Sequence, residues 1–326
     1  MITQKLYMAP LKGFTDHLFR STFAAHFGGF DLAVAPFISS KKDRKTKERY
    51  VKDVLPENNA RLRVIPQILS KSPEDFVYLA NYLYDLGHET VNWNLGCPYP
   101  TVAKKGRGAG MLPHTESICT FLDHAIPALK PALSIKTRLG WQTGDDLFRL
   151  VPYLNRYPLK ELIIHPRTGI QRYDGAVDLD AVERLMAVVK IPLVYNGDIR
   201  RLEDFQLLSR RFSGINRWMI GRGCLADPFL PGNIKTGKTE RIDGILKIKR
   251  FHDAMFDAYC AALDGPAHVL NKMKGLWGYF EQMFEACSKT MKKIRKTRNT
   301  DNYRELVAGF FESEAVLKKA DGLTLS

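Results

Sequence analysis

The sequence predicts an α/β protein: a (β/α)8 TIM barrel followed by a small C-terminal helical domain. Eight short apolar or β-branched segments recur in about the first 240 residues, and stretches with helical spacing separate most of them. Strands that alternate with helices pair in parallel through crossover connections, and eight such units suit a closed barrel. From about residue 241 the segments are helical only. An open doubly wound sheet is the alternative architecture.

The predicted strands follow one another at intervals that leave room for a helix. In chain order they are KLYMAP, FDLAVAPF, RVIPQIL, TVNWNLG, LSIKTRL, ELIIHP, IPLVYNG and RWMIGRG. The clearest helix is SPEDFVYLANYLYDLG, which Ser72 can cap, Pro73 can begin and Gly87 follows. Its apolar face consists of Phe76, Leu79, Leu83 and Leu86. TESICTFLDHAIPAL and LEDFQLLSRRF are predicted helices of the same kind, whereas KKDRKTKERY is too polar to predict one.

Two long helical segments without a strand between them make up the rest of the chain. They are ILKIKRFHDAMFDAYCAAL and MKGLWGYFEQMFEACSKTMKKIRK, and the linker GNIKTGKTERIDG precedes them. We therefore expect a catalytic barrel domain over residues 1–240 and a helical domain over residues 241–326. In the second segment we expect the basic residues to continue the apolar helix that contains Trp277, Phe280 and Phe284.

The composition is that of an ordinary soluble globular protein, with 45% hydrophobic and 26% charged residues. No apolar run reaches the length of a membrane span and the first residues lack a secretory pattern, so we expect a cytoplasmic protein without membrane contacts. With 49 basic and 35 acidic residues, the net charge of +14 favours a polyanionic partner, nucleic acid first. The five scattered cysteines form no CxxC pair, which argues against disulfides and against a metal site. We expect a monomer.

Polar side chains follow the apolar part of most predicted strands. In a barrel the carboxyl ends of all strands meet at one mouth, where active sites lie. One such residue would mean little, but here they recur at six successive strands. The positions are Pro10, Gln67, Asn94, Lys136, Arg138, His165, Arg167, Asn196, Asp198, Gly221 and Arg222.

The last two predicted strands indicate a phosphate site. VYNGDI and MIGRGCLADP each contain a glycine turn, at Gly197 and Gly221, where backbone N–H groups can approach an anion closely. Arg222 adds a planar guanidinium suited to phosphate. The loops after strands seven and eight are the usual place for a phosphate in this architecture.

Lys136 lies inside an otherwise apolar strand and therefore needs an anionic or electron-rich partner. A flavin would supply one, because negative charge builds up at the N1–C2 carbonyl edge of the reduced ring. Gln67 and Asn94 could then offer amide hydrogen bonds to the same ring. The alternative is an ion pair between Lys136 and the carboxylate of Asp198.

These segments together resemble the tRNA-dihydrouridine synthase family. The matching motifs are MAPLKGFTD, PQILSKSP, NWNLGCPYPTVAKKGRGAGML, IKTRLGW, IHPRT, YNGDI and MIGRGCLADP, which span the predicted barrel. The resemblance implies FMN as cofactor, NADPH as its reductant and 5,6-dihydrouridine as product. On this basis we expect the flavin to be bound by Pro10, Leu11, Gln67, Asn94, Lys136, His165, Asn196, Gly197, Asp198, Gly221 and Arg222.

The same resemblance places Cys97 at the position of the catalytic acid. Reducing the uracil C5=C6 bond needs hydride at one carbon and a proton at the other, so FMN N5 would deliver hydride to C6 and Cys97 a proton to C5. A cysteine with an ordinary pKa of about 8.5 is mostly protonated near neutrality. A lone cysteine is otherwise a small buried apolar residue, but the flanking Gly96 and Pro98 in a polar loop argue against that role here.

Three basic segments predict contacts with tRNA: KKDRKTKER (41–49), AKKGRG (103–108) and MKKIRKTR (291–298). A basic helix is usually only a solvated face, so each segment alone is weak support. Tyr99 could stack on the flipped uracil, or pack on the barrel rim. The expected RNA contacts are Tyr99, Lys104, Lys105, Arg107, Arg138, Arg167, Lys292, Lys293, Arg295 and Lys296.

Two other functions compete with this interpretation. A small-molecule flavoenzyme, similar to a dihydroorotate dehydrogenase or an ene-reductase, would share the barrel and FMN but leaves the +14 charge unexplained. An RNA-binding protein that has lost catalysis is disfavoured by the presence of Cys97 and Lys136. The chain departs from the family pattern at Lys12, Asn92 and Leu95, so the target uridine stays open, as does the choice between transfer RNA and ribosomal RNA.

Overall fold

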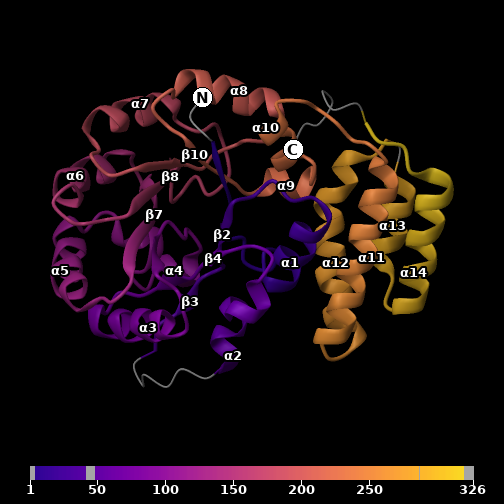
Figure 1. Cartoon of the computed structure of the whole chain (residues 1–326), viewed down its shortest axis with the longest axis horizontal. Helices are drawn as coiled ribbons and strands as arrows, with labels where there is room; N and C mark the ends of the chain where they lie inside the picture. Colours follow the sequence, from indigo (N-terminus) through magenta and orange to yellow (C-terminus); the bar gives the residue numbers. More distant parts are fainter. Residues whose placement is uncertain (1–3, 42–47, 286, 319–326) are drawn as a thin grey trace.

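The computed structural model describes residues 4–41, 48–285 and 287–318 and has the predicted barrel architecture (Figure 1). All strand pairs are parallel, in the order β3-β5-β6-β7-β8-β9-β10-β1-β2-β4. This nearly sequential order excludes the doubly wound alternative. The strands are β1 (Lys5–Met8), β2 (Leu32–Val34), β3 (Ile38–Ser39), β4 (Val64–Ile65), β5 (Gln67–Leu69), β6 (Thr90–Leu95), β7 (Ala132–Gly140), β8 (Glu161–Thr168), β9 (Leu193–Tyr195) and β10 (Arg217–Ile220).

The third predicted strand is divided into β4 and β5 at Pro66, which has no N–H to offer a sheet. β4 pairs with β2, while β5 pairs with β6. Because β4 and β5 are consecutive in the chain, separated by Pro66 alone, this covalent connection joins the two ends of the sheet. The short β3 pairs with β5 and accounts for the remaining difference from eight strands.

Helices surround the strands, as the alternating pattern predicts (Figure 1). The helix after β5 starts where expected, because the Ser72 side chain accepts a hydrogen bond from the Asp75 backbone N–H at 3.1 Å. Phe76, Leu79 and Leu83 form its buried face, with Leu86 partly buried. The barrel helices are α1 (His17–His26), α2 (Glu48–Val51), α3 (Pro73–Asp85), α4 (Pro100–Ala103), α5 (Thr115–Ala125), α6 (Asp145–Leu154), α7 (Leu179–Val188), α8 (Leu202–Arg211), α9 (Arg222–Ala226) and α10 (Leu230–Thr236).

The interior of the barrel is a packed core rather than a pore. Its side chains come from six different strands or strand ends, and they are Tyr7, Ala9, Val34, Ile65, Ile163, Val194 and Met219. A second, larger core lies between the strands and the surrounding helices. The polar residues at the strand ends are therefore supported from below by a filled barrel.

Four further helices lie beside the barrel next to α1 (Figure 1): α11 (Gly244–Ala262), α12 (Pro266–Phe280), α13 (Ser288–Lys296) and α14 (Thr300–Gly309). Phe251 of α11 packs edge-on against Phe19, Phe23 and Phe27, with ring centroids 5.2–6.1 Å apart. The first five residues of the predicted linker, GNIKT, belong to α10. The boundary at residue 240 stays a prediction.

The prediction of one continuous helix through the basic C-terminal segment is wrong. α12 ends at Phe280 and a 3-10 turn follows at Glu281–Met283. Phe284 then forms an antiparallel bridge with Leu317, and α13 begins only at Ser288. Burial of Phe284 beside Phe310 and Phe311 explains the break, because the chain must turn to place this ring in the core.

No helix in the described part of the chain is long and apolar enough to cross a membrane.

Candidate active site

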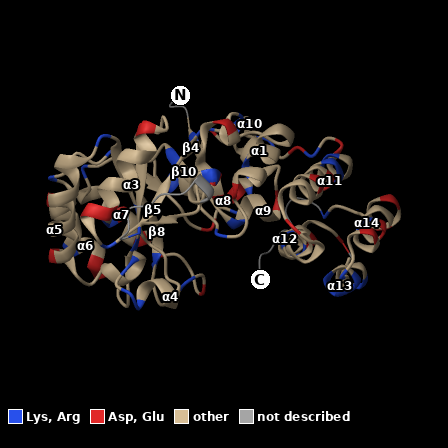
Figure 2. Cartoon of the chain, turned by 90° about the horizontal axis from the view of Figure 1, so that it is seen from below, with Lys and Arg blue, Asp and Glu red and all other residues tan. Residues whose placement is uncertain are grey.

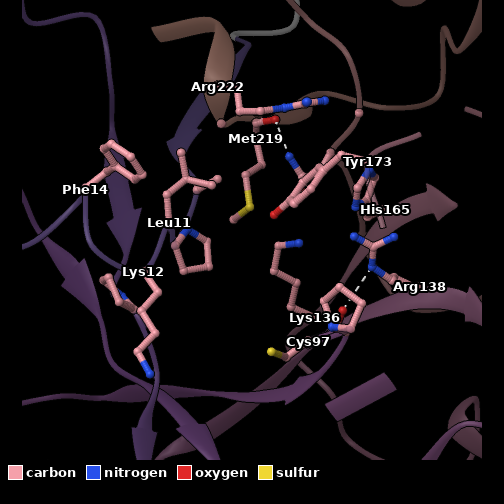
Figure 3. Close-up of a pocket in the computed structure, with 18 of the residues that line it drawn as sticks. Leu11, Lys12, Phe14, Cys97, Lys136, Arg138, His165, Tyr173, Met219 and Arg222 are labelled. Carbon is pink, nitrogen blue, oxygen red and sulfur yellow. Dashed lines mark hydrogen bonds between the residues drawn. The ribbon is translucent and has the colours of Figure 1, made fainter. Parts of the chain in front are cut away.

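A cavity of about 340 Å³ opens at the carboxyl ends of the strands (Figure 3). This volume is in the range of small-molecule and cofactor sites. Most of the residues predicted for the site line this one cavity, although they are spread over more than 200 positions of the chain. They are Pro10, Leu11, Gln67, Asn94, Cys97, Tyr99, Lys136, Arg138, His165, Asn196, Gly197, Asp198, Gly221 and Arg222.

A chain of buried amides holds the loop that carries Cys97. The Asn94 side-chain oxygen accepts hydrogen bonds from the backbone N–H groups of Gly96 at 3.1 Å and Cys97 at 2.8 Å. Asn94 donates to Gln67 at 2.7 Å, and Gln67 donates to Asn92 at 2.8 Å. Two amides of the cavity floor are thus oriented before any ligand binds. Asn92 is a supporting residue that the sequence analysis noted only as a departure from the family pattern.

The Cys97 thiol points into the cavity from a tightly packed loop (Figure 3). The residue is only 8% exposed, and burial raises the pKa of its thiol, although Lys12, Arg138 and Lys136 oppose this effect. The thiol is therefore protonated at neutral pH. The loop requires glycine at position 108, after Cys97. The φ angle of Gly108 is +57°, and a Cβ there would lie 2.7 Å from the Cys97 carbonyl oxygen. The second half of the loop thus packs against Cys97.

Lys136 extends from β7 into the middle of the cavity (Figure 3). Burial, together with the nearby Arg138, lowers the pKa of its ammonium to about 7. Among the described residues, none forms an ion pair or hydrogen bond with Lys136. The alternative of an ion pair with Asp198 is therefore wrong, because that carboxylate is occupied by arginines.

Asp198 is the single acidic residue among the described side chains that line the cavity. Its carboxylate lies 2.5 Å from Arg167, 3.3 Å from Arg222 and 3.6 Å from Arg200. These arginines keep the pKa of Asp198 below its usual value despite partial burial, which acts in the opposite direction. A carboxylate repels a phosphate, so Asp198 can serve an anionic ligand by positioning the arginines.

Arg167 lies behind the cavity wall and does not line it. It is 1% exposed and donates to the Gly175 carbonyl at 2.7 Å, to Asp198 and, at 3.1 Å, to Nε2 of His165. A guanidinium can only donate, so Nε2 of His165 is the acceptor and the ring proton is on Nδ1. Burial and four surrounding cations keep the pKa of His165 well below its usual value. His165 is therefore a neutral ring with one N–H to donate.

Arg138 connects β7 to two neighbouring loops. Its Nε donates to the Gly96 carbonyl at 3.0 Å, shown as a dashed line in Figure 3, and one terminal nitrogen donates to the Thr168 carbonyl at 2.8 Å. Burial lowers its pKa to about 10. Much of the hydrogen-bonding capacity of Arg138 thus holds the Cys97 loop.

Several cavity residues lie outside the predicted set. Tyr173 packs between the guanidinium groups of Arg138 and Arg222, 5.6 and 4.6 Å from its ring centroid. Tyr279 reaches the cavity from α12, and Lys12 lies 5.1 Å from the Phe37 ring. Aromatic residues in loops carry no period that would mark them. The missed lining residues include Lys12, Phe14, Phe37, Tyr173, Arg200, Met219 and Tyr279.

The remaining predicted RNA contacts lie outside the cavity. Lys104 and Lys105 are exposed, and Arg107 is half-buried. Figure 2 shows lysine and arginine gathered on α13, where Lys292, Lys293, Arg295 and Lys296 are exposed, opposite the buried Met291 and Ile294. Arg295 is already bound to Glu281 of the preceding turn, at 2.6 Å. Most of the 41–49 segment lies outside the described residues.

The cavity suits an organic anion better than a metal ion. Lys12, Lys136, Arg138, Arg200 and Arg222 line it with one carboxylate among them. In residues 4–41, 48–285 and 287–318, no three His, Cys, Asp or Glu side chains are placed to hold a metal. A Cβ on Gly221 would meet Ala9 and Leu11 only at ordinary contact distances of 3.5 and 3.8 Å, so packing does not require glycine there. The missing side chain leaves room for a ligand next to the backbone.

Comparisons with known proteins agree on one family. The family model described as dihydrouridine synthase (Dus) matches residues 7–321. The chain is 28% identical over 234 residues to tRNA-dihydrouridine synthase B of Vibrio vulnificus, covering 70% of each protein. It is 24% identical over 317 residues to a tRNA-dihydrouridine(16) synthase of Neisseria meningitidis serogroup B, covering 94% of each.

Solved structures with the same fold include morphinone reductase, with a TM-score of 0.53 and 13% identity over 72% of this chain and 86% of that one. An old yellow enzyme homologue from Zymomonas mobilis matches with a TM-score of 0.53 and 12% identity, over 73% and 90% of the two chains. At this identity the similarity establishes the barrel fold alone.

Proposed function

The chain belongs to the dihydrouridine synthase family, and from this premise we propose that it uses FMN and NADPH to reduce specific uridines in tRNA to 5,6-dihydrouridine. One observation carries the proposal: a protonated thiol and a lysine without an acidic partner point into the same cationic cavity. A proton donor and an unpaired cation are what the reduction of a uracil ring beside an anionic cofactor requires.

The residues present fit FMN. Bound flavin would supply the hydride for one carbon of the uracil C5=C6 bond. Lys136 would stabilise negative charge on the ring, with the preoriented amides of Gln67 and Asn94 beside it. Arg222 and the backbone near Gly197 and Gly221 would hold the phosphate.

Cys97 donates the proton to C5 of the uracil. Its raised pKa keeps the thiol protonated between turnovers, and Lys136, Arg138 and Lys12 stabilise the thiolate that forms. Asn94 and Arg138 fix the loop through Gly96 and the Cys97 backbone, which keeps the sulfur in place at the cavity wall. Tyr99, which is 54% exposed at the mouth, can stack on the base that leaves the RNA stack.

The region from residue 241 onward would contact the RNA backbone through α13. This helix buries Met291 and Ile294 and presents Lys292, Lys293 and Lys296 to solvent. Lysine contacts to phosphates bind RNA without reading its sequence and position it over the mouth.

The direct test is conversion of uridine in a tRNA transcript by the purified protein with FMN and NADPH, measured by mass spectrometry of the digested RNA. Cys97→Ala should lower the turnover number by roughly 10²- to 10⁴-fold, because it lacks the general acid. It should still bind FMN and consume NADPH. Cys260→Ala, at an exposed thiol on α11, is the matched control. Normal turnover by Cys97→Ala would remove this thiol from the mechanism, and absence of product with the unaltered protein would exclude the proposed reaction.

The α13 contact has its own test. Changing Lys292, Lys293 and Lys296 to Glu should flatten the slope of log affinity for tRNA against log salt by about 2 to 3, at roughly 0.7–0.9 per phosphate contact. Arg295→Glu is the internal control and should change the slope less, because Glu281 already binds Arg295. An unchanged slope for the triple variant would mean that α13 is only a solvated face.

A further inference from the structure

The helical part of the chain reaches into the barrel cavity. Tyr279, the penultimate residue of α12, lines the cavity together with Phe14 from the loop after β1. The two rings meet edge to face, with centroids 5.2 Å apart and planes at 90°. Gly275, one turn earlier on the same helix, also faces Phe14, because a Cβ there would lie 3.4 Å from this ring. α12 thus packs directly on a loop of the cavity wall.

Two polar side chains hold this loop against the helices. Lys272 of α12 donates to the Asp16 carboxylate at 2.6 Å and to the Gly13 carbonyl at 2.9 Å. The Tyr259 hydroxyl of α11 donates to the same carboxylate at 3.2 Å. Asp16 also caps α1 by accepting from the Phe19 backbone at 3.1 Å. Because Asp16 is shared by three helices, the position of Tyr279 relative to the cavity is determined by several contacts.

The hydroxyl of Tyr279 is not used by the protein. It has no hydrogen-bond partner among the described residues, although the side chain is half-buried. Burial raises its pKa, and Arg222, Tyr173 and Tyr99 are close enough to affect it electrostatically. Tyrosines from three distant segments therefore converge on one mouth, and the hydroxyl of Tyr279 is free to bind a ligand there.

α13 is attached to the end of α12 that carries Tyr279. Tyr279 is two positions before Glu281, whose carboxylate binds Arg295 of α13 at 2.6 and 2.7 Å. Lys274 of α12 donates to the Thr297 carbonyl at the end of α13. The exposed lysines of α13 are therefore linked to Tyr279 through the short turn at Glu281–Met283, which the ion pair between Glu281 and Arg295 holds against α13.

We propose that Tyr279 is a substrate-positioning residue that hydrogen-bonds to the uridine nucleotide entering the cavity, with Lys272 and Asp16 holding it in place. The inference rests on the proposed function, and it goes further because it makes α12 part of the active site rather than a docking surface alone. We expect Tyr279 to bind the nucleotide rather than the flavin. Tyr279 belongs to α12, which packs beside α13, and α13 carries the basic face that would bind the RNA backbone.

The test uses the full chain loaded with FMN and a tRNA transcript. Tyr279→Phe retains the ring on Phe14 and removes the hydroxyl, so kcat/KM for tRNA should fall about 3- to 10-fold, mostly through KM. Tyr279→Ala should lower it further. Lys272→Met should act in the same direction, and Lys272→Arg should restore most of the loss. Tyr84→Phe, at an exposed tyrosine on α3, is the matched control.

The flavin content and the rate of flavin bleaching by NADPH should stay at wild-type values in the Tyr279 variants. An unchanged kcat/KM for tRNA in Tyr279→Phe and Tyr279→Ala would overturn the inference while leaving the proposed function intact. Loss of flavin or slower bleaching in Tyr279→Phe would overturn it too, because Tyr279 would then serve the cofactor. A wild-type protein that forms no dihydrouridine would overturn the proposed function, and this inference with it.

Discussion

The two ends of the barrel are both hollow and both rich in cations, yet they are built differently. The carboxyl end has the cavity of about 340 Å³ described above, and the amino end has one of about 410 Å³. Lys5, Arg63, Lys160 and Arg217 line the amino-end cavity. Composition alone would describe both regions as basic pockets.

Three of the four amino-end cations, Arg63, Lys160 and Arg217, have hydrogen-bonding or charged partners within the protein, whereas Lys5 is exposed to solvent. Arg217 and the Tyr7 hydroxyl bind one oxygen of the buried Glu161, at 3.3 and 2.9 Å. Lys160 donates to Thr90 at 2.6 Å, and Arg63 pairs with Glu89 at 2.9 Å on the surface. Such pairs close the lower end of the barrel, where polar groups usually serve stability.

At the carboxyl end one carboxylate serves three arginines, and Lys136 has no acid at all among the described residues. Unpaired charge in a cavity costs stability and is retained where a ligand completes it. The distinction between a structural and a binding pocket is thus the pairing of its charges and not their number.

The largest expected difference between the two ends concerns Lys136. Lys136→Met should weaken FMN binding by roughly 10- to 100-fold, because a charge-assisted contact is lost. The same substitution should raise the melting temperature of the flavin-free protein, because it removes a desolvated ammonium. Lys160→Met at the amino end should do neither. Flavin titration and thermal unfolding of both variants provide the measurement, and equal effects on FMN affinity would contradict the comparison.

A pH titration gives the next largest effect. Lys136 has a pKa of about 7 in the flavin-free protein, so it is charged below pH 7 and loses its proton above it. Because an anionic ligand favours the ammonium, FMN affinity should be level below pH 7 and fall above it, by at most about tenfold per pH unit. His165 stays neutral throughout this range and does not contribute. Binding measured between pH 6 and 9 should lose this slope in Lys136→Met; a slope that persists there would assign it to another group.

The smallest expected effect is at Glu161. Glu161→Ala leaves the buried Tyr7 hydroxyl and Arg217 without their acceptor and should lower the free energy of unfolding by about 1–3 kcal/mol. Glu161→Gln keeps an acceptor for Tyr7 and should cost less, since burial already raises the pKa of Glu161 and disfavours its charge. Denaturant unfolding gives the energies, and FMN affinity should not change in either variant. A loss of FMN binding would mean that the amino end also shapes the cofactor site.

The amino-acid sequence determined the parts of this protein that depend on local pattern. The eight apolar segments, the cap at Ser72 and the polar residues at the strand ends predicted the barrel and most of the cavity lining. They did so because strand and helix periods are local, and because parallel pairing brings all carboxyl ends to one side. The match to the family motifs depends on the same short segments.

Only the tertiary structure decided which charges are paired. Lys136 lies within an apolar strand and Lys160 directly precedes one, yet Lys136 lacks a partner among the described residues and Lys160 donates to Thr90, 70 positions away. Arg167 was predicted to bind RNA, but in the fold it lies behind His165 and determines which ring nitrogen carries the proton. Tyr279 is held at the mouth by contacts between distant segments, among them the ion pair between Lys272 and Asp16, 256 positions apart. Hydrogen bonds and ion pairs act over a few ångströms in space, so the partner of a side chain is set by the packing of distant elements and not by its neighbours in the chain.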